Sequence, residues 1–223
     1  MEEHRNKEGQ LHREDGPAVM RADGTVEWYI NDVWHRERDP AVIYADGSQE
    51  WWLEGVRHRE DGPALIYTDG AQEWWLNNKR HRENGPAYIS ASGSQHWYIN
   101  DKRHREDGPA IIKANGKQEW WINGKLHREN GPAIICADGS QEWWINGNRH
   151  KKEGPAVIRA NGTQEWYIKG KCYRKDSLPS VLDKKHNTMT FASGAVVPMS
   201  ANDYEKYRYK PPGRFTKAAL REN

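Results

Sequence analysis

Apolar and aromatic positions recur along this chain in units much longer than the period of a strand or a helix. Each unit contains a short apolar run, such as Pro132 to Ala137, and a short aromatic run, such as Ser140 to Ile145. Both runs are rich in β-forming residues, and the unit is too short for a strand–helix–strand element. The pattern therefore predicts two short strands in every unit.

The unit is an internal repeat with a constant length of 23 residues. Its marker is a histidine that occurs in seven copies: His12, His35, His58, His81, His104, His127 and His150. Repeats of this length bury their apolar surface against their neighbours rather than around a globular centre. A catalytic site is normally built once, so we expect a protein that is not an enzyme and needs no cofactor.

Turn residues separate the predicted strands. The first turn of each unit is mostly Asp-Gly or Asn-Gly, as at Asp138-Gly139, and the second is Asn-Gly or a related pair, as at Asn77-Asn78. These residues tolerate the positive φ that both central positions of a type I′ turn require. We therefore predict an all-β fold, an elongated and twisted antiparallel β-meander of seven hairpin repeats, with a C-terminal cap and tail.

Four segments follow from this repeat. Residues 1–10 are expected to form an N-terminal cap, residues 11–171 hold the seven repeats, residues 172–199 form a degenerate repeat or cap, and residues 200–223 form a basic aromatic tail. Within the third segment, Thr188 to Val197 is expected to supply a closing hairpin around Ser193-Gly194. An open sheet needs caps because its end strands expose unpaired backbone groups.

The first aromatic of each aromatic run is always Trp, and the residue two positions later is always Ile or Leu. Residues two apart on a strand share a face, and burying one Trp removes about 200 Å² from water, a gross gain of about 5 kcal/mol. This column is therefore predicted to form the core. Its structural members include Trp51, Trp74, Trp97, Trp120 and Trp143.

The opposite face carries a glutamate and the second aromatic of each run, and we expect it also to carry a column that varies from copy to copy. Two interpretations of this face remain open: it binds a partner, or loops half-bury it. The binding candidates are Trp52, Trp75, Tyr98, Trp121, Trp144, Tyr44 and Tyr67.

One stretch of the chain resembles the MORN repeat: Trp121-Ile122-Asn123-Gly124-Lys125-Leu126-His127 followed by Ala137-Asp138-Gly139-Ser140. The resemblance covers about 160 of the 223 residues and looks closest to the MORN-like repeats of YwqK-type antitoxins and of phage and viral repeat proteins. The chain departs from the standard unit in its longer loop, Arg128 to Pro132, and in Gln141-Glu142-Trp143. The resemblance implies a non-enzymatic scaffold for a protein partner, such as an antitoxin or a phage-borne inhibitor of a host protein.

The recurring His-Arg-Glu stretch suggests a metal site, because His and Glu are common ligands. A zinc ion needs three or four ligands within about 2.0 to 2.3 Å, whereas histidines of neighbouring units would lie about 10 Å apart. We therefore interpret these histidines as structural, each with a ring N–H bonded to a loop carbonyl: His58, His81, His104 and His127. The adjacent Arg and Glu side chains are expected to form ion pairs between units.

Charge divides the chain into an acidic array and a basic end. Residues 1–171 hold 24 basic and 27 acidic residues, and the remainder holds 10 and 5. Aromatics beside basic residues suit a nucleotide or a single-stranded nucleic acid, which is the alternative ligand, but the acidic array disfavours it. The tail is expected either to be disordered or to bind a partner or a second copy of the chain, through Tyr204, Tyr207, Arg208 and Tyr209.

The compartment of the protein is predicted from the targeting and membrane signals that its sequence lacks. The chain has two cysteines, no signal-peptide pattern and no apolar run long enough to span a bilayer. We therefore expect a protein without a membrane partner that resides in the cytoplasm, or in the host cytoplasm if a phage encodes it.

Overall fold

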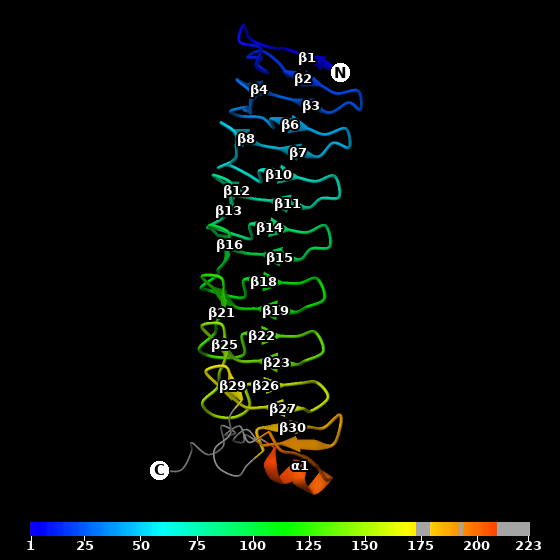
Figure 1. Ribbon diagram of the computed structural model, residues 1–223, viewed down its shortest axis with the longest axis vertical. Coiled ribbons are helices and arrows are strands. Elements are labelled where there is room, and N and C mark those ends of the chain that lie inside the picture. The colour runs from blue at the N-terminus through cyan, green and yellow to red at the C-terminus, as the bar shows by residue number, and fades with distance from the viewer. Residues whose placement is uncertain (173–178, 192–193, 209–223) are drawn as a thin grey trace, which may run out of the picture. The chain divides into compact units, whose positions relative to one another are not determined.

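The computed structural model describes residues 1–172, 179–191 and 194–208. The chain forms two compact units, Met1–Ala137 and Asp138–Asn223. Both consist of short antiparallel strands joined by tight turns, which confirms the predicted all-β meander (Figure 1). No helix among the described residues has the length and apolar character needed to cross a bilayer.

In the first unit one ladder pairs the apolar strand of each repeat with the glutamate-bearing strands on both sides. Leu65, for example, lies opposite Glu73 of its own repeat and Glu50 of the preceding one. Residues paired in this way share a face of the sheet, so apolar and acidic side chains alternate along it. In order, the ladder is β1 (Glu2–Glu3), β2 (Val19–Met20), β3 (Val26–Glu27), β6 (Val42–Ile43), β7 (Gln49–Glu50), β10 (Leu65–Ile66), β11 (Gln72–Glu73), β14 (Tyr88–Ile89), β15 (Gln95–His96), β18 (Ile111–Ile112), β19 (Gln118–Glu119) and β22 (Ile134–Ile135).

Each aromatic run leaves this ladder at its first Trp, so the single strand predicted from Ser140 to Ile145 is wrong. The two residues after that Trp pair with the two residues beyond the second turn in a separate hairpin. Each repeat therefore contributes two strand pairs to the fold instead of one. In the first unit these hairpins are β4 (Tyr29–Ile30) with β5 (Val33–Trp34), β8 (Trp52–Leu53) with β9 (Val56–Arg57), β12 (Trp75–Leu76) with β13 (Lys79–Arg80), β16 (Tyr98–Ile99) with β17 (Lys102–Arg103), and β20 (Trp121–Ile122) with β21 (Lys125–Leu126).

The two turns of the repeat differ in type. At the second turn both central residues have positive φ, as at Asn123 (50°) and Gly124 (77°), which confirms the predicted type I′ geometry. At the first turn only the glycine has a positive φ, as at Gly47 (88°). The prediction of a type I′ turn at this position is therefore wrong. The Tyr44 N–H instead donates to the Ser48 carbonyl at 2.9 Å and closes a three-residue loop that ends in a left-handed glycine.

The most deeply buried column is Ala, not Trp. The residue after each loop proline is fully enclosed in all seven repeats: Ala18, Ala41, Ala64, Ala87, Ala110, Ala133 and Ala156. Within the first Trp column only Trp51 and Trp166 are buried, and the others, including Trp74, Trp97, Trp120 and Trp143, are half-buried. A single sheet has no second layer that encloses so large a side chain. The prediction of a tryptophan core is therefore confirmed at Trp51 and Trp166 and wrong for the half-buried members of the column.

The second unit ends in a cap. Trp166, Leu182, Met189 and Met199 form a buried cluster, and Tyr204 packs against it. The pairing of β31 with β32 confirms the closing hairpin expected over Thr188 to Val197. The ladder of this unit is β23 (Gln141–Glu142), β26 (Val157–Ile158), β27 (Gln164–Glu165), β30 (Val181–Asp183), β31 (Thr188–Thr190) and β32 (Val196–Pro198), with the hairpins β24 (Trp144–Ile145) to β25 (Asn148–Arg149) and β28 (Tyr167–Ile168) to β29 (Lys171–Cys172), and helix α1 (Ala201–Tyr207).

Candidate functional site: an aromatic and guanidinium face

A glutamate column runs along one face of the ladder and positions the aromatic side chains above it. Each carboxylate accepts a hydrogen bond of 2.7–3.0 Å from the aromatic residue two positions later. This confirms that glutamate and second aromatic share a face. The pairs are Glu27 with Tyr29, Glu50 with Trp52, Glu73 with Trp75 and Glu119 with Trp121 in the first unit, and Glu142 with Trp144 and Glu165 with Tyr167 in the second.

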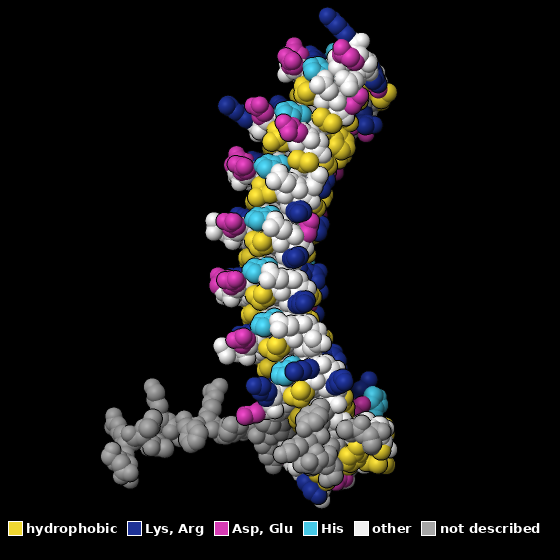
Figure 2. Space-filling model, turned by 60° about the vertical axis from the view of Figure 1, so that its left-hand side comes forward, with side chains coloured by type: hydrophobic (Ala, Val, Ile, Leu, Met, Phe, Trp, Pro, Cys, Tyr) yellow, Lys and Arg dark blue, Asp and Glu magenta, His cyan; other side chains and the backbone are white. Residues whose placement is uncertain are grey.

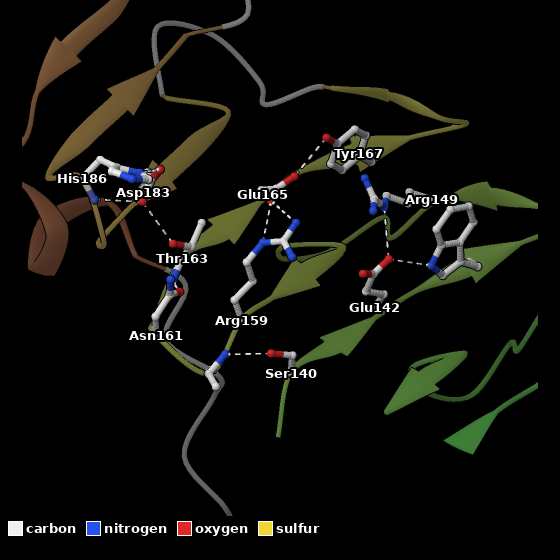
Figure 3. A network of polar contacts seen from close by, with 12 residues as sticks. Ser140, Glu142, Arg149, Arg159, Asn161, Thr163, Glu165, Tyr167, Asp183 and His186 are labelled. Atoms are coloured by element: carbon white, nitrogen blue, oxygen red, sulfur yellow. Dashed lines mark hydrogen bonds and ion pairs between the residues drawn. The ribbon is translucent and has the colours of Figure 1, made fainter. Parts of the chain in front are cut away.

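The variable column lies on this face too, as predicted. The Tyr44 hydroxyl donates to Glu50 at 3.0 Å, and the Tyr67 hydroxyl donates to Glu73 at 3.4 Å. In the second unit Arg159 occupies the equivalent position and donates to Glu165, which also accepts from Tyr167 (Figure 3). One carboxylate therefore holds an aromatic side chain that every repeat has and a side chain that differs between repeats.

A third column, absent from the sequence prediction, places arginines between the aromatics. Trp52 lies opposite Arg57, and Trp75 lies opposite Arg80. The Arg57 guanidinium is 4.8 Å from the ring centroids of both Trp52 and Trp75, and that of Arg80 is 5.0 Å from Trp75. These distances favour cation–π attraction. We call this surface of the first unit the aromatic face: Tyr44, Trp52, Arg57, Tyr67, Trp75, Arg80, Tyr98, Arg103 and Trp121.

The sequence contains a signal for this arginine column. The type I′ turn fixes the hairpin register, so the residue before each repeat histidine must lie opposite the second aromatic. That residue is Trp34 before the second repeat histidine, where its ring centroid lies 4.8 Å from that of Trp52, and Leu126 before the sixth, where it faces Trp121. Arginines therefore occupy this column at Arg57, Arg80 and Arg103 in the first unit and at Arg149, opposite Trp144, in the second.

Burial and hydrogen bonding compete at the carboxylates. Burial alone would raise the pKa of Glu27, but hydrogen bonds from Arg21 and Tyr29 outweigh it and hold the pKa below its ordinary value. The pKa of Glu119 is lowered in the same way, because hydrogen bonds from Lys117 and Trp121 outweigh burial. Burial, the Glu50 charge and the bond to Glu50 raise the pKa of Tyr44 to about 12, which keeps its hydroxyl a donor.

One repeat breaks the glutamate column, where His96 replaces the acid. Its ring packs edge-on against Tyr88, with 5.3 Å between centroids, and lies 6.4 Å from Tyr98. Burial, followed by the charges of Arg103 and Lys113, lowers the pKa of His96. A neutral imidazole therefore sits among cations at the position where the other repeats place a carboxylate.

Restoring the acid with His96→Glu is expected to raise the free energy of unfolding by about 1 kcal/mol at neutral pH, because Arg103 and Lys113 gain a partner. The wild-type protein should also lose stability as pH falls below about 6.5, since the unfolded state binds the His96 proton more readily than the folded state. Urea unfolding at several pH values measures the difference between the two proteins. A variant that is less stable than wild type at neutral pH would contradict the expectation.

The His-Arg-Glu loop lies on the other side of each aromatic run, and its arginine is bound by groups close to it in the sequence. The Arg59 guanidinium stacks on Trp51 at 4.0 Å and donates to the Asp61 carboxylate (2.8 Å) and the Pro63 carbonyl (3.2 Å). A Cβ on Gly62 would come within 2.9 Å of this guanidinium, so the loop glycine makes room for it. The same stacking recurs as Arg36 on Trp28, Arg82 on Trp74, Arg105 on Trp97, Arg128 on Trp120 and Lys151 on Trp143.

The predicted ion pairs between Arg and Glu of neighbouring repeats are therefore wrong. Arg59 and Arg105 bind an aspartate of their own loop, Asp61 and Asp107. The loop glutamate points into solvent: Glu60 is 86% exposed at the side chain. A guanidinium that stacks on the preceding tryptophan and binds the aspartate of its own loop is not free to reach the next repeat.

The repeat histidines connect successive repeats. The backbone N–H of Asn123 donates to Nδ1 of His104 at 3.2 Å, and Asn77 does the same to His58 at 3.4 Å. Nδ1 of the same two rings also lies 3.1 Å and 2.9 Å from the side-chain oxygens of Asn123 and Asn77. The turn asparagine is therefore the partner of Nδ1 in both repeats, where a loop carbonyl was predicted. His81 lies 3.0 Å from the Asn100 side chain, and His127 Nε2 lies 4.0 Å from Glu129. The structural interpretation of this column fits these contacts.

Open furrows lie between successive loops on this side. One has a volume of about 760 Å³, and Trp97, Ile99, Glu83 and Glu106 are among the residues that line it. Figure 2 shows the histidines and acidic side chains that recur there at each repeat. Within the described ranges, no three His, Cys, Asp or Glu side chains gather as a metal ion would need. The loop arginine in each furrow is already bound within its own loop.

The residues predicted as tail anchors belong largely to the cap. The Tyr204 hydroxyl donates to the Gly162 carbonyl at 2.6 Å, and Tyr204 and Tyr207 pack against the buried cluster around Leu182. Arg208 ends helix α1 and donates to Glu205 at 2.8 Å. The rings of Tyr204 and Tyr207 therefore stabilise their own unit, and their binding of a partner stays a prediction. Tyr209 lies outside the described residues.

Comparisons with known proteins identify no family for this chain. No family model matches it, and no curated protein matches it. The geometry of the aromatic face is therefore the guide to function.

Proposed function

We propose that the chain is a non-enzymatic β-repeat scaffold that binds another protein through the aromatic face. The observation that carries this proposal is that buried carboxylates fix the half-buried rings. Glu50 accepts from Nε1 of Trp52 at 2.7 Å, and Glu73 accepts from Nε1 of Trp75 at 2.9 Å. Side chains held in place before binding lose little conformational entropy when a partner covers them.

The residue types of the face support the same proposal. Trp, Tyr and Arg are the residues that most often dominate the energy of protein interfaces. Tyr44 and Tyr67, at 38% and 37% exposure, are among the most exposed large apolar residues of the part of the chain described by the structure. Because the variable column changes from repeat to repeat, it distinguishes one stretch of the face from the next.

The finer proposal follows the resemblance to MORN-like repeats. The partner would be a protein that an antitoxin or a phage-borne inhibitor blocks, and the complex would form in the cytoplasm. Nothing in this proposal uses the C-terminal tyrosines, because Tyr204 and Tyr207 pack within the cap.

A capture experiment with face variants tests the proposal. The immobilised full chain is exposed to a bacterial lysate and compared with a variant of the aromatic face, Tyr44→Ser with Tyr67→Ser. A matched control, Glu60→Ser with Glu83→Ser, changes two exposed side chains of the loop side. We expect the wild type and the control to retain the same protein, and the face variant, checked for an unchanged thermal unfolding midpoint, to lose it. Equal retention by all three would refute the proposal.

A single-stranded nucleic acid is the alternative ligand, and the alternation of rings and guanidinium groups favours it. Base stacking on aromatics and contacts from arginine are the usual means by which proteins hold single strands. Against it, arginines of the face are paired with carboxylates of their own surface, as Arg57 is with the partly buried Glu50 at 3.0 Å. Titration of the Trp fluorescence with an oligonucleotide at two salt concentrations tests it, and an unchanged signal at both would exclude stacking on this face.

A further inference from the structure

The charges of the aromatic face are separated by depth. The carboxylates lie below the surface, with side-chain exposures of 4% for Glu27, 13% for Glu50, 9% for Glu73 and 10% for Glu119. Their cationic partners are more exposed, at 48% for Arg21, 21% for Arg57, 37% for Arg80 and 28% for Lys117. A ligand that approaches this face therefore meets cations before anions. Charge complementarity favours an acidic ligand.

The way the arginines are held leaves donors for such a ligand. Arg80 uses Nε for its hydrogen bond to Glu73 at 2.9 Å. Arg149 of the second unit repeats this contact with Glu142 at 3.1 Å (Figure 3). Among the described residues the two terminal NH₂ groups of Arg80 and Arg149 make no hydrogen bond. Arg57 instead donates to Glu50 through Nη2 at 3.0 Å, which leaves its Nη1 group for a ligand. Two parallel N–H donors are the arrangement that binds a carboxylate in bidentate fashion.

The spacing of the arginine column restricts the shape of the ligand. Consecutive arginines, Arg57, Arg80 and Arg103, are separated by one repeat, which is two strand spacings, or about 9.6 Å. An extended β-strand places side chains on one side about 6.8 Å apart, which does not match. A polyproline II helix returns to the same side every three residues, or about 9.3 Å. Over the two intervals between these arginines the mismatch stays below about 1 Å.

The rings between the arginines suit the same conformation. Trp75 lies between Arg57 and Arg80, with its ring centroid 4.8 and 5.0 Å from them, and the next ring is Tyr98. Proline-rich segments bind to surfaces lined with aromatic rings, and their preformed helix loses little entropy on binding. Rings and guanidinium groups at one repeat distance therefore match prolines and acids at one helical turn.

We propose that the aromatic face binds an acidic segment of its partner protein in the polyproline II conformation, with Asp or Glu at every third position. This inference rests on the proposed function and specifies the chemistry of the partner. Arg57, Arg80 and Arg103 bind the carboxylates, and Trp75 and Tyr98 contact the prolines between them.

Labelled synthetic peptides and the full chain test this inference by fluorescence anisotropy. One peptide repeats Glu-Pro-Pro, the second has the same composition with all its Glu residues in one block, and the third repeats Lys-Pro-Pro. We expect the Glu-Pro-Pro repeat to bind about tenfold more tightly than the block peptide and the lysine peptide not to bind. Equal affinity for the first two peptides would overturn the inference.

Two variants test whether the peptide binds to the arginine column. Arg103→Leu is compatible with folding because the next repeat has Leu126 at the equivalent position opposite an aromatic. Lys102→Leu is the matched control, since it removes the same charge from the adjacent residue, which alternates to the other side of β17. We expect Arg103→Leu to weaken binding about fivefold to tenfold and the control to change it less than about twofold. Equal effects of the two would overturn the assignment.

The outcomes separate this inference from the proposed function. If no peptide binds while protein capture still depends on Tyr44 and Tyr67, the inference fails and the proposed function stands. If an oligonucleotide binds in a manner that Arg103→Leu abolishes and no peptide binds, the face is a nucleic-acid site and both fail.

Discussion

Replacing Glu119 with alanine is expected to lower the free energy of unfolding by about 3 kcal/mol at neutral pH. The carboxylate is 2.7 Å from Nζ of Lys117 and accepts from Nε1 of Trp121 at 2.9 Å. Both groups lose this contact in the variant. The Lys117 side chain is 28% exposed, so water solvates it in part. The loss of unfolding free energy should therefore lie near the lower end of the range for removing one partner of a buried ion pair. Urea unfolding monitored by Trp fluorescence measures the effect.

The pH dependence separates the ion pair from the lost volume. Because the pKa of Glu119 lies below its ordinary value of 4.5, the carboxylate stabilises the fold above that pH. This stabilisation is lost as pH falls through the folded-state pKa. Glu119→Gln keeps the shape of the side chain and should cost about 1 to 2 kcal/mol at neutral pH, and progressively less as the pH is lowered through the folded-state pKa. A deficit that stays constant over this range would contradict the ion-pair argument.

The hairpins of the fold can be predicted from the sequence because their turns depend on local backbone preferences. The pair at Asn123-Gly124 tolerates positive φ at both positions, and the structure has 50° and 77° there. The Asp-Gly pairs are locally similar but form a longer loop. At Asp46-Gly47 the Asp46 carboxylate accepts from the Ser48 N–H at 2.8 Å, so the residue after the pair belongs to the turn. Side-chain bonding to the backbone is not visible in a dipeptide pattern.

The side chains that share a face can also be predicted, whereas depth of burial cannot. Strand alternation places Glu50 and Trp52 together, and their hydrogen bond confirms it. Hydrophobicity then assigns the core to tryptophan, but Trp74 and Trp97 are half-buried and Ala87 is fully enclosed. The burial of a side chain depends on which neighbouring backbone segments cover it. The carbonyl of Ala87 accepts from the Trp74 N–H at 2.8 Å, so neighbouring strands close over the smaller side chain.

The contacts of the arginines are the part of the site that could least be predicted from the sequence. Arg59 and Arg57 lie two residues apart, yet Arg59 is bound within its own loop and Arg57 stands between two rings of the aromatic face. Composition and local charge cannot distinguish them, because each has acidic residues nearby in the sequence. The distinction arises from hairpin register, which sets Arg57 opposite Trp52. Assigning function to a charged residue in such a repeat therefore requires the register first.

Replacing the loop arginine Arg105 with alanine is expected to destabilise the fold by about 2 kcal/mol. Its guanidinium stacks on Trp97 at 4.2 Å and donates to Asp107 (2.8 Å) and to the Pro109 carbonyl (3.3 Å). In the variant the guanidinium no longer covers the ring of Trp97, so the ring is more exposed to water. The fluorescence emission of Trp97 should therefore shift to longer wavelength.

The conservative variant Arg105→Lys is the matched control, because the chain itself has a lysine at this position in its last repeat. Nζ of Lys151 lies 3.5 Å from the Trp143 ring centroid. Arg105→Lys should therefore lose less than about 1 kcal/mol and leave the fluorescence maximum unchanged. Because stability in a repeat array depends on each repeat and its neighbours, hydrogen exchange in Arg105→Ala should increase first at the backbone N–H groups of Trp97 and Arg105. If alanine and lysine destabilise the protein equally, stacking on Trp97 contributes nothing.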